Sequence, residues 1–166
     1  MTRGGGEPQR LSPTPYNDEW WTPPWIFLRM GVWFDLDVCA PSGGVPWVPA
    51  TYHLERDEDG LTALWFGRVW CNPPYNNINS WLDRMAEHGN GIALSLGDSS
   101  TQRFARHVNL ASLVCFIDQR IKFVRPGWQA SQQVDFSNIL IAYGDECGEA
   151  LIKSGLGVCV RPVIAP

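Results

Sequence analysis

The segment Asn72-Pro73-Pro74-Tyr75 combines residue types that suit a site for a planar amino group. Its two prolines fix φ near about −65° and make the turn rigid, and Asn72 is held out of helical geometry because a proline follows it. The Asn72 carboxamide oxygen and the Pro73 carbonyl are then two acceptors, with the Tyr75 ring as a stacking face. This arrangement predicts group transfer to the exocyclic nitrogen of a nucleobase. The alternative is that the prolines only end a strand and Tyr75 only covers core.

Asp37 is a second candidate for chemistry, within the apolar stretch 34–40. Its carboxylate can accept hydrogen bonds from an ammonium group, and the backbone near Ala40 can approach a ligand. An Asp after a strand often caps a turn instead, and that interpretation stays open. Gly43 and Gly44 come too late for a dinucleotide fingerprint, and no phosphate-loop lysine motif is present, so NAD and ATP are not expected as cofactors.

Basic residues gather in one part of a chain whose net charge is −4. Between residues 101 and 130, five basic side chains stand against the single acidic Asp118. These five are candidate contacts to DNA phosphates, because phosphate neutralisation supplies much of the affinity for nucleic acid. They are Arg103, Arg106, Arg120, Lys122 and Arg125. A solvated face without a partner is an equally good interpretation.

The segment 125–135 contains residues that suit contact with bases. They are Trp128, Gln129, Gln132 and Gln133. Glutamine side chains can pair bidentately with adenine, which makes the segment a candidate for base recognition. A mobile polar loop without this role is the alternative.

Composition is that of a globular protein: 166 residues, 45% hydrophobic and 18% charged. The five cysteines form no C-x-x-C pair and lack zinc-ligand spacing, so reduced thiols and no metal site are expected. No apolar run is long enough for a signal peptide or a membrane span, so a cytoplasmic protein is expected. Residues 1–17, rich in Gly, Pro, Gln and Ser, predict a flexible tail before one compact domain over 18–166.

Helix and strand patterns alternate over this domain. Helices are predicted from a Thr22 N-cap to Gly31 and over 79–88, 100–108 and 146–153. Strands or extended segments are predicted over 34–40, 61–66, 69–71, 91–96, 111–117, 121–124, 138–143 and 158–164. The pattern indicates an α/β fold with a mixed, mostly parallel sheet and helices on its faces. Ligands bind outside the carboxyl ends of such strands, where Asp37 and Asn72 fall.

Four segments, in this order, resemble the phage-type DNA adenine methyltransferase family. They are 18–24 (Asp-Glu-Trp-Trp-Thr-Pro-Pro), 35–40 (Asp-Leu-Asp-Val-Cys-Ala), 67–75 (Gly-Arg-Val-Trp-Cys-Asn-Pro-Pro-Tyr) and 120–123 (Arg-Ile-Lys-Phe). The resemblance spans about residues 16–144. It implies a Rossmann-like, S-adenosyl-L-methionine-dependent enzyme encoded by a phage or prophage. Its substrate would be the exocyclic amino group of adenine in double-stranded DNA.

The resemblance also implies residue roles. Asn72, Pro73, Pro74 and Tyr75 would form the catalytic loop, against which the extruded base stacks. Trp21, Thr22 and Pro23 would line the cofactor pocket, together with Asp37 and Ala40. The chain departs from most amino-methyltransferases after Asp37, where a glycine-rich turn is usual.

Two rival functions remain open at this stage. Asn-Pro-Pro-Tyr also occurs in enzymes that methylate glutamine side chains of proteins, where the same acceptors hold a side-chain amide. A non-enzymatic alternative is a degenerate methyltransferase fold kept as a DNA-binding or partner-binding module. Cofactor binding separates the three, because the module would bind no S-adenosyl-L-methionine and the protein-modifying enzyme would bind it but ignore DNA.

Overall fold

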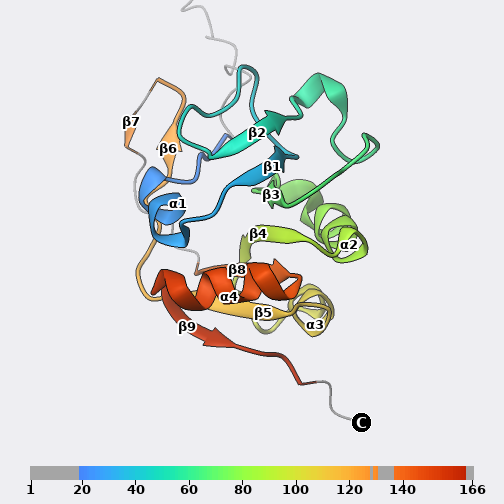
Figure 1. The fold of residues 1–166 in the computed structure, drawn as a ribbon, viewed down its shortest axis with the longest axis vertical. Helices are drawn as coiled ribbons and strands as arrows, with labels where there is room; N and C mark the ends of the chain where they lie inside the picture. The colour runs from blue at the N-terminus through green and yellow to red at the C-terminus, as the bar shows by residue number, and fades with distance from the viewer. Residues whose placement is uncertain (1–18, 128, 131–136, 164–166) are drawn as a thin grey trace, which may run out of the picture.

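The computed structural model describes residues 19–127, 129–130 and 137–163 (Figure 1). The tail predicted over 1–17 lies outside the described residues, as do Trp128, Gln132, Gln133 and the side chain of Gln129. The helices of the described part are α1 (Pro24–Met30), α2 (Ile78–His88), α3 (Gln102–Asn109) and α4 (Asp145–Ser154), with the short 3₁₀ turns η1 (Arg56–Glu58) and η2 (Tyr75–Asn77). No helix in this part of the chain is long and apolar enough to cross a membrane.

Seven strands form one sheet in the order β2-β1-β3-β4-β8-β5-β9, and β6 and β7 form a separate hairpin. The bounds are β1 (Phe34–Asp37), β2 (Ala50–His53), β3 (Val69–Cys71), β4 (Gly91–Leu96), β5 (Leu113–Ile117), β6 (Val124–Arg125), β7 (Gln129–Ala130), β8 (Asn138–Tyr143) and β9 (Gly157–Val160). Helices cover both faces of the sheet, as the alternating pattern predicted.

The sheet is mixed, but parallel pairing is confined to one half of it. Strands β2, β1, β3 and β4 pair in parallel, whereas β4–β8, β8–β5 and β5–β9 are antiparallel. Five strands therefore share one direction, as a mostly parallel sheet requires. Only half of the pairings are parallel, however, because β8 is inserted antiparallel between β4 and β5 and β9 runs against β5.

Alternate residues of the central strands supply two apolar layers. In β3, Trp70 belongs to the layer under α1 and α4, where its ring meets Phe27 at a centroid distance of 4.8 Å. Its neighbours Val69 and Cys71 belong to the other layer, with residues of α2 and α3. All three are buried, and burial on both faces is what a continuous apolar run predicts for a central strand.

The start of α1 differs from the prediction that Thr22 is its N-cap. Pro23 occupies the cap position without a side-chain hydrogen bond, and Pro24 begins the helix. Thr22 is instead only 2% exposed, and its carbonyl accepts a hydrogen bond from the Trp47 indole at 2.8 Å. The end is as predicted, because Gly31 adopts a left-handed conformation (φ 61°) that suits a glycine C-cap.

Two further predictions differ in the segment between β1 and β3. Residues 61–66 do not form a strand, since the Thr62 N–H and hydroxyl both bond back to the Asp59 carbonyl and close a turn. Strand β2 was not predicted, because it is an exposed edge strand without apolar alternation. The other predicted elements are present with shifted ends. Of the strand predicted over 121–124, only Val124 lies in a strand, β6, where it pairs with Ala130 of β7.

Candidate functional site

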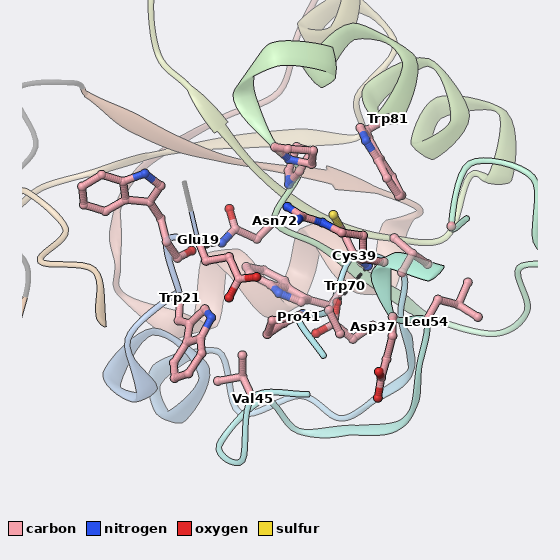
Figure 2. Close-up of a pocket in the computed structure, with 18 of the residues that line it drawn as sticks. Glu19, Trp21, Asp37, Cys39, Pro41, Val45, Leu54, Trp70, Asn72 and Trp81 are labelled. Carbon is pink, nitrogen blue, oxygen red and sulfur yellow. Dashed lines mark hydrogen bonds between the residues drawn. The ribbon is translucent and has the colours of Figure 1, made fainter. Parts of the chain in front are cut away.

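A cavity of about 480 Å³ opens at the carboxyl ends of β1 and β3 (Figure 2). Strand β1 ends at Asp37, and β3 leads directly into Asn72 and the two prolines. The segment before α1 forms a second wall, and the residues around 38–48 and 54–60 close the remaining side. The volume is in the range typical of small-molecule sites.

Eight of the nine residues predicted for catalysis and cofactor binding line this cavity. They are Trp21, Thr22, Asp37, Ala40, Asn72, Pro73, Pro74 and Tyr75. Pro23, the buried N-cap residue of α1, does not line it. The topology thus brings together residues that are up to 54 positions apart in the sequence.

Asn72 has its carboxamide oriented by a backbone carbonyl. The Nδ2 group donates to the carbonyl of Trp20 at 2.6 Å. A carbonyl can only accept, so the atom that faces it must be the NH₂ group of the amide. The Oδ1 atom therefore remains the acceptor of this side chain at the cavity.

Trp20 and Trp21 in turn contact β6 and the residue before it. Trp21 exchanges two backbone hydrogen bonds with Val124, each 2.9 Å long. The Trp20 ring meets Phe123 edge-on at 6.1 Å, and the Arg125 guanidinium lies 4.6 Å from the centre of that ring. The carbonyl that orients Asn72 is therefore held by contacts from residues 123–125.

Asp37 is a buried carboxyl group whose pKa lies near neutral pH. It is 4% exposed, and its Oδ1 accepts the Cys39 N–H at 3.2 Å. Burial raises the pKa of Asp37 to about 7, while the Cys39 N–H and the nearby His53 act in the opposite direction. The turn-capping role considered from the sequence is present, and the same carboxylate lines the cavity, where a cationic ligand would favour its ionised form.

The far wall of the cavity, formed by residues 54–60, was not among the site residues predicted from the sequence. Glu55 links two loops there, because its carboxylate accepts from the Gly43 N–H at 3.0 Å and the Ser42 hydroxyl at 3.1 Å. Asp59 is the only non-glycine residue with a positive φ (46°) in the described part of the chain. A Cβ on Gly60 would lie 2.2 Å from the Val38 carbonyl, so only glycine fits. The Asp-Gly pair was the available sequence signal for this turn.

The residues that line the cavity include chemical groups suited to S-adenosyl-L-methionine. Asp37 can take an ammonium group, and Val38, Val45 and Leu54 provide apolar wall. The hydroxyl of Thr22, which lines the cavity, is buried without a hydrogen-bond partner among the described residues. Across those same residues there is no group of three or more His, Cys, Asp or Glu side chains placed to hold a metal ion.

The five predicted phosphate contacts fall into two groups rather than one patch. Arg103 and Arg106 lie on α3, and Arg106 pairs with Asp83 at 3.1 Å. The other group, formed by Arg120, Lys122 and Arg125, leads into the β6–β7 hairpin beside the cavity wall. Figure 1 places α3 and the hairpin far apart on the molecule. Contact with DNA stays a prediction for both groups.

These features define an α/β protein with a ligand cavity at the carboxyl ends of parallel strands and an Asn-Pro-Pro-Tyr loop in its wall. A family model described as DNA N-6-adenine-methyltransferase (Dam) matches residues 10–146, and the chain belongs to this family. The family resemblance predicted from the four sequence segments is thereby confirmed. No curated protein and no solved structure gives a significant match to the chain.

Proposed function

We propose that this protein transfers the methyl group of S-adenosyl-L-methionine to the exocyclic amino nitrogen of adenine in double-stranded DNA. The observation that carries the proposal is the orientation of Asn72, whose NH₂ group is committed to Trp20 in the wall of a cavity that also contains Asp37. Family membership supplies the substrate class. A phage or prophage origin and action in the bacterial cytoplasm belong to the same proposal.

The cofactor half of the cavity is built around Asp37. Its carboxylate binds the ammonium group of the cofactor, while Trp21, Thr22 and Ala40 form the surrounding wall. When bound, S-adenosyl-L-methionine supplies a methyl group on a positively charged sulfur, which departs with the electron pair of the broken carbon–sulfur bond. The pKa of Asp37 is about 7 in the free protein, and it falls when the ammonium group of the cofactor binds beside the carboxylate.

The base half of the site is the Asn72–Tyr75 loop. An adenine inside a duplex cannot reach the cavity, so the base is extruded and stacks against the Tyr75 ring. Asn72 Oδ1 and the Pro73 carbonyl accept the two amino hydrogens and draw the nitrogen lone pair out of conjugation with the ring. Orientation and electrostatics then promote the attack, after which the nitrogen releases one proton to water.

The test is transfer of a labelled methyl group. Purified protein is incubated with labelled S-adenosyl-L-methionine and unmethylated duplex DNA, and the DNA is digested to nucleosides. We expect labelled N6-methyladenine from the wild type, far less from Asn72→Ala, and wild-type yield from Asn79→Ala, an exposed asparagine on α2. Cofactor binding without label in DNA would favour a protein substrate, and absence of cofactor binding would favour the inactive module.

A further inference from the structure

Asn138 is a buried carboxamide without hydrogen bonds in the described structure. It is the first residue of β8 and only 7% exposed. Neither its Nδ2 nor its Oδ1 has a hydrogen-bond partner among the described residues. Leaving a buried donor and acceptor unpaired is unfavourable, and most buried polar side chains in proteins are paired. Packing alone therefore gives no reason for an amide at this position.

The position of Asn138 in the sheet places it behind the Asn-Pro-Pro-Tyr loop. Cys71, the last residue of β3, pairs with Ala93 in the middle of β4. Strand β4 then continues to Leu96, which pairs with Asn138. The end of β4 and the start of β8 thus extend past β3 at the edge where the loop leaves the sheet.

Tyr75 is the residue of the loop that Asn138 approaches. Burial raises the pKa of the Tyr75 hydroxyl, and the nearby Asn138 carboxamide acts in the opposite direction. The two groups are thus neighbours, although they do not meet the geometry of a formed hydrogen bond. Tyr75 itself is half-buried and lines the cavity. Its hydroxyl is the group that lies near the Asn138 carboxamide.

We propose that Asn138 is a positioning residue that holds the Tyr75 hydroxyl and so sets the plane of the ring against which the target adenine stacks. The inference rests on the proposed function. A carboxamide suits this role because it can donate to or accept from the hydroxyl. We expect this hydrogen bond to be formed in the complex with the base. Asn138 touches neither the base nor the cofactor.

The test compares Asn138→Leu, Tyr75→Phe and the double variant with the wild type. Each is assayed for thermal stability, affinity for S-adenosyl-L-methionine, and kcat and KM for methylation of unmethylated duplex DNA. Leucine has the same number of side-chain heavy atoms as asparagine, branched at the same position, and needs no hydrogen bond, so we expect the melting temperature of Asn138→Leu to be unchanged or higher. If the Asn138 amide instead stabilised the fold, the melting temperature of Asn138→Leu would be lower than that of the wild type.

We expect kcat of Asn138→Leu to fall about tenfold while its cofactor affinity is unchanged, because the stacking surface is misplaced. Tyr75→Phe, which removes only the hydroxyl, should show a similar loss, and the double variant should be no worse than either single one. Wild-type kcat in Asn138→Leu or in Tyr75→Phe, or two losses that multiply, would overturn the inference. If Asn138→Leu fails to fold, the inference also fails. A wild type that labels no DNA would overturn the proposed function as well, which separates the two failures.

Discussion

Asn72 donates its side-chain NH₂ to the backbone carbonyl of Trp20, a residue 52 positions earlier in the chain, at 2.6 Å. Because Asn72 follows β3 and Trp20 precedes α1, this bond joins two separate walls of the cavity. It also decides which end of the amide can act as an acceptor for a substrate. The orientation of the proposed catalytic side chain therefore depends on the segment before α1.

Trp20→Ala tests this dependence. The variant keeps the backbone carbonyl but removes the ring that contacts Phe123 and Arg125, so the carbonyl is less firmly placed. We expect kcat for methyl transfer to fall about tenfold, since small misplacements of catalytic groups are costly. Trp33→Ala is the matched control, because Trp33 is 62% exposed and does not line the cavity. Equal activity of the two variants would show that the Trp20 ring has no role in orienting Asn72.

Asp37→Asn should raise stability at pH 8. The pKa of Asp37 is about 7 in the folded protein and lower in the unfolded chain. Between about pH 4 and 7 the folded state therefore holds a proton that the unfolded state has released, and this contribution to stability is lost as the pH rises through 7. Above pH 7 the buried carboxylate costs at most about 4 kcal/mol. Thermal unfolding from pH 4 to 8 should show a difference between variant and wild type that widens up to pH 7.

The same substitution should weaken cofactor binding. If the ionised carboxylate of Asp37 binds the ammonium group, the affinity of the wild type for S-adenosyl-L-methionine rises as the pH passes through 7, and protons are released on binding. Asp37→Asn should bind more weakly and lose this pH dependence. Asp57→Asn, an exposed carboxylate in η1, is the control for general charge effects. The measurement is isothermal titration calorimetry at several pH values. If Asp37→Asn and Asp57→Asn both bind S-adenosyl-L-methionine like the wild type, Asp37 does not bind the ammonium group.

Gly60→Ala should distort the far wall of the cavity. The added Cβ would lie 2.2 Å from the Val38 carbonyl and 2.7 Å from the Trp81 ring, so the backbone has to move. We expect a loss of about 1–3 kcal/mol in the free energy of unfolding, together with weaker cofactor binding. Gly148→Ala on α4 is the control, because its nearest contact would be 3.3 Å and it does not line the cavity. Unchanged cofactor affinity in Gly60→Ala would show that this wall does not contact the ligand.

Lys122→Ala and Arg106→Ala distinguish the two basic groups. Lys122 is exposed in the segment that leads to the hairpin beside the cavity, whereas Arg106 lies on the distant α3 and pairs with Asp83 of α2. We expect Lys122→Ala to weaken DNA binding and to reduce the slope of log K against log salt concentration by about one. Arg106→Ala should leave that slope unchanged. The reverse pattern would place DNA over α3.

Local sequence signals predicted the elements that carry the site. The apolar run 91–96 and the glycine that follows the helical pattern 79–88 indicate a buried strand and the end of a helix without knowledge of distant contacts, and the structure has β4 and the end of α2 there. The Asn-Pro-Pro-Tyr turn was recognised for the same reason, since its rigidity comes from its own prolines. These features depend only on neighbouring residues.

Features that depend on distant pairing were not predictable in this way. The insertion of β8 between β4 and β5 is decided by partners far apart in the sequence, so the sheet was expected to be more parallel than it is. Trp20 carries no local sign that its carbonyl binds Asn72. Thr22 resembles an N-cap locally, but burial in the cavity wall and the Trp47 indole determine its role.

The most direct test of the central claim is single-turnover methyl transfer by wild type and Asn72→Ala, each saturated with S-adenosyl-L-methionine and mixed with unmethylated duplex DNA. Because Asn72 is proposed to hold the amino group rather than the cofactor, both proteins should bind the cofactor with the same affinity. The rate of N6-methyladenine formation in Asn72→Ala should be lower by about 100-fold or more. A wild-type rate in Asn72→Ala would contradict the assignment of Asn72 as the residue that orients the adenine nitrogen.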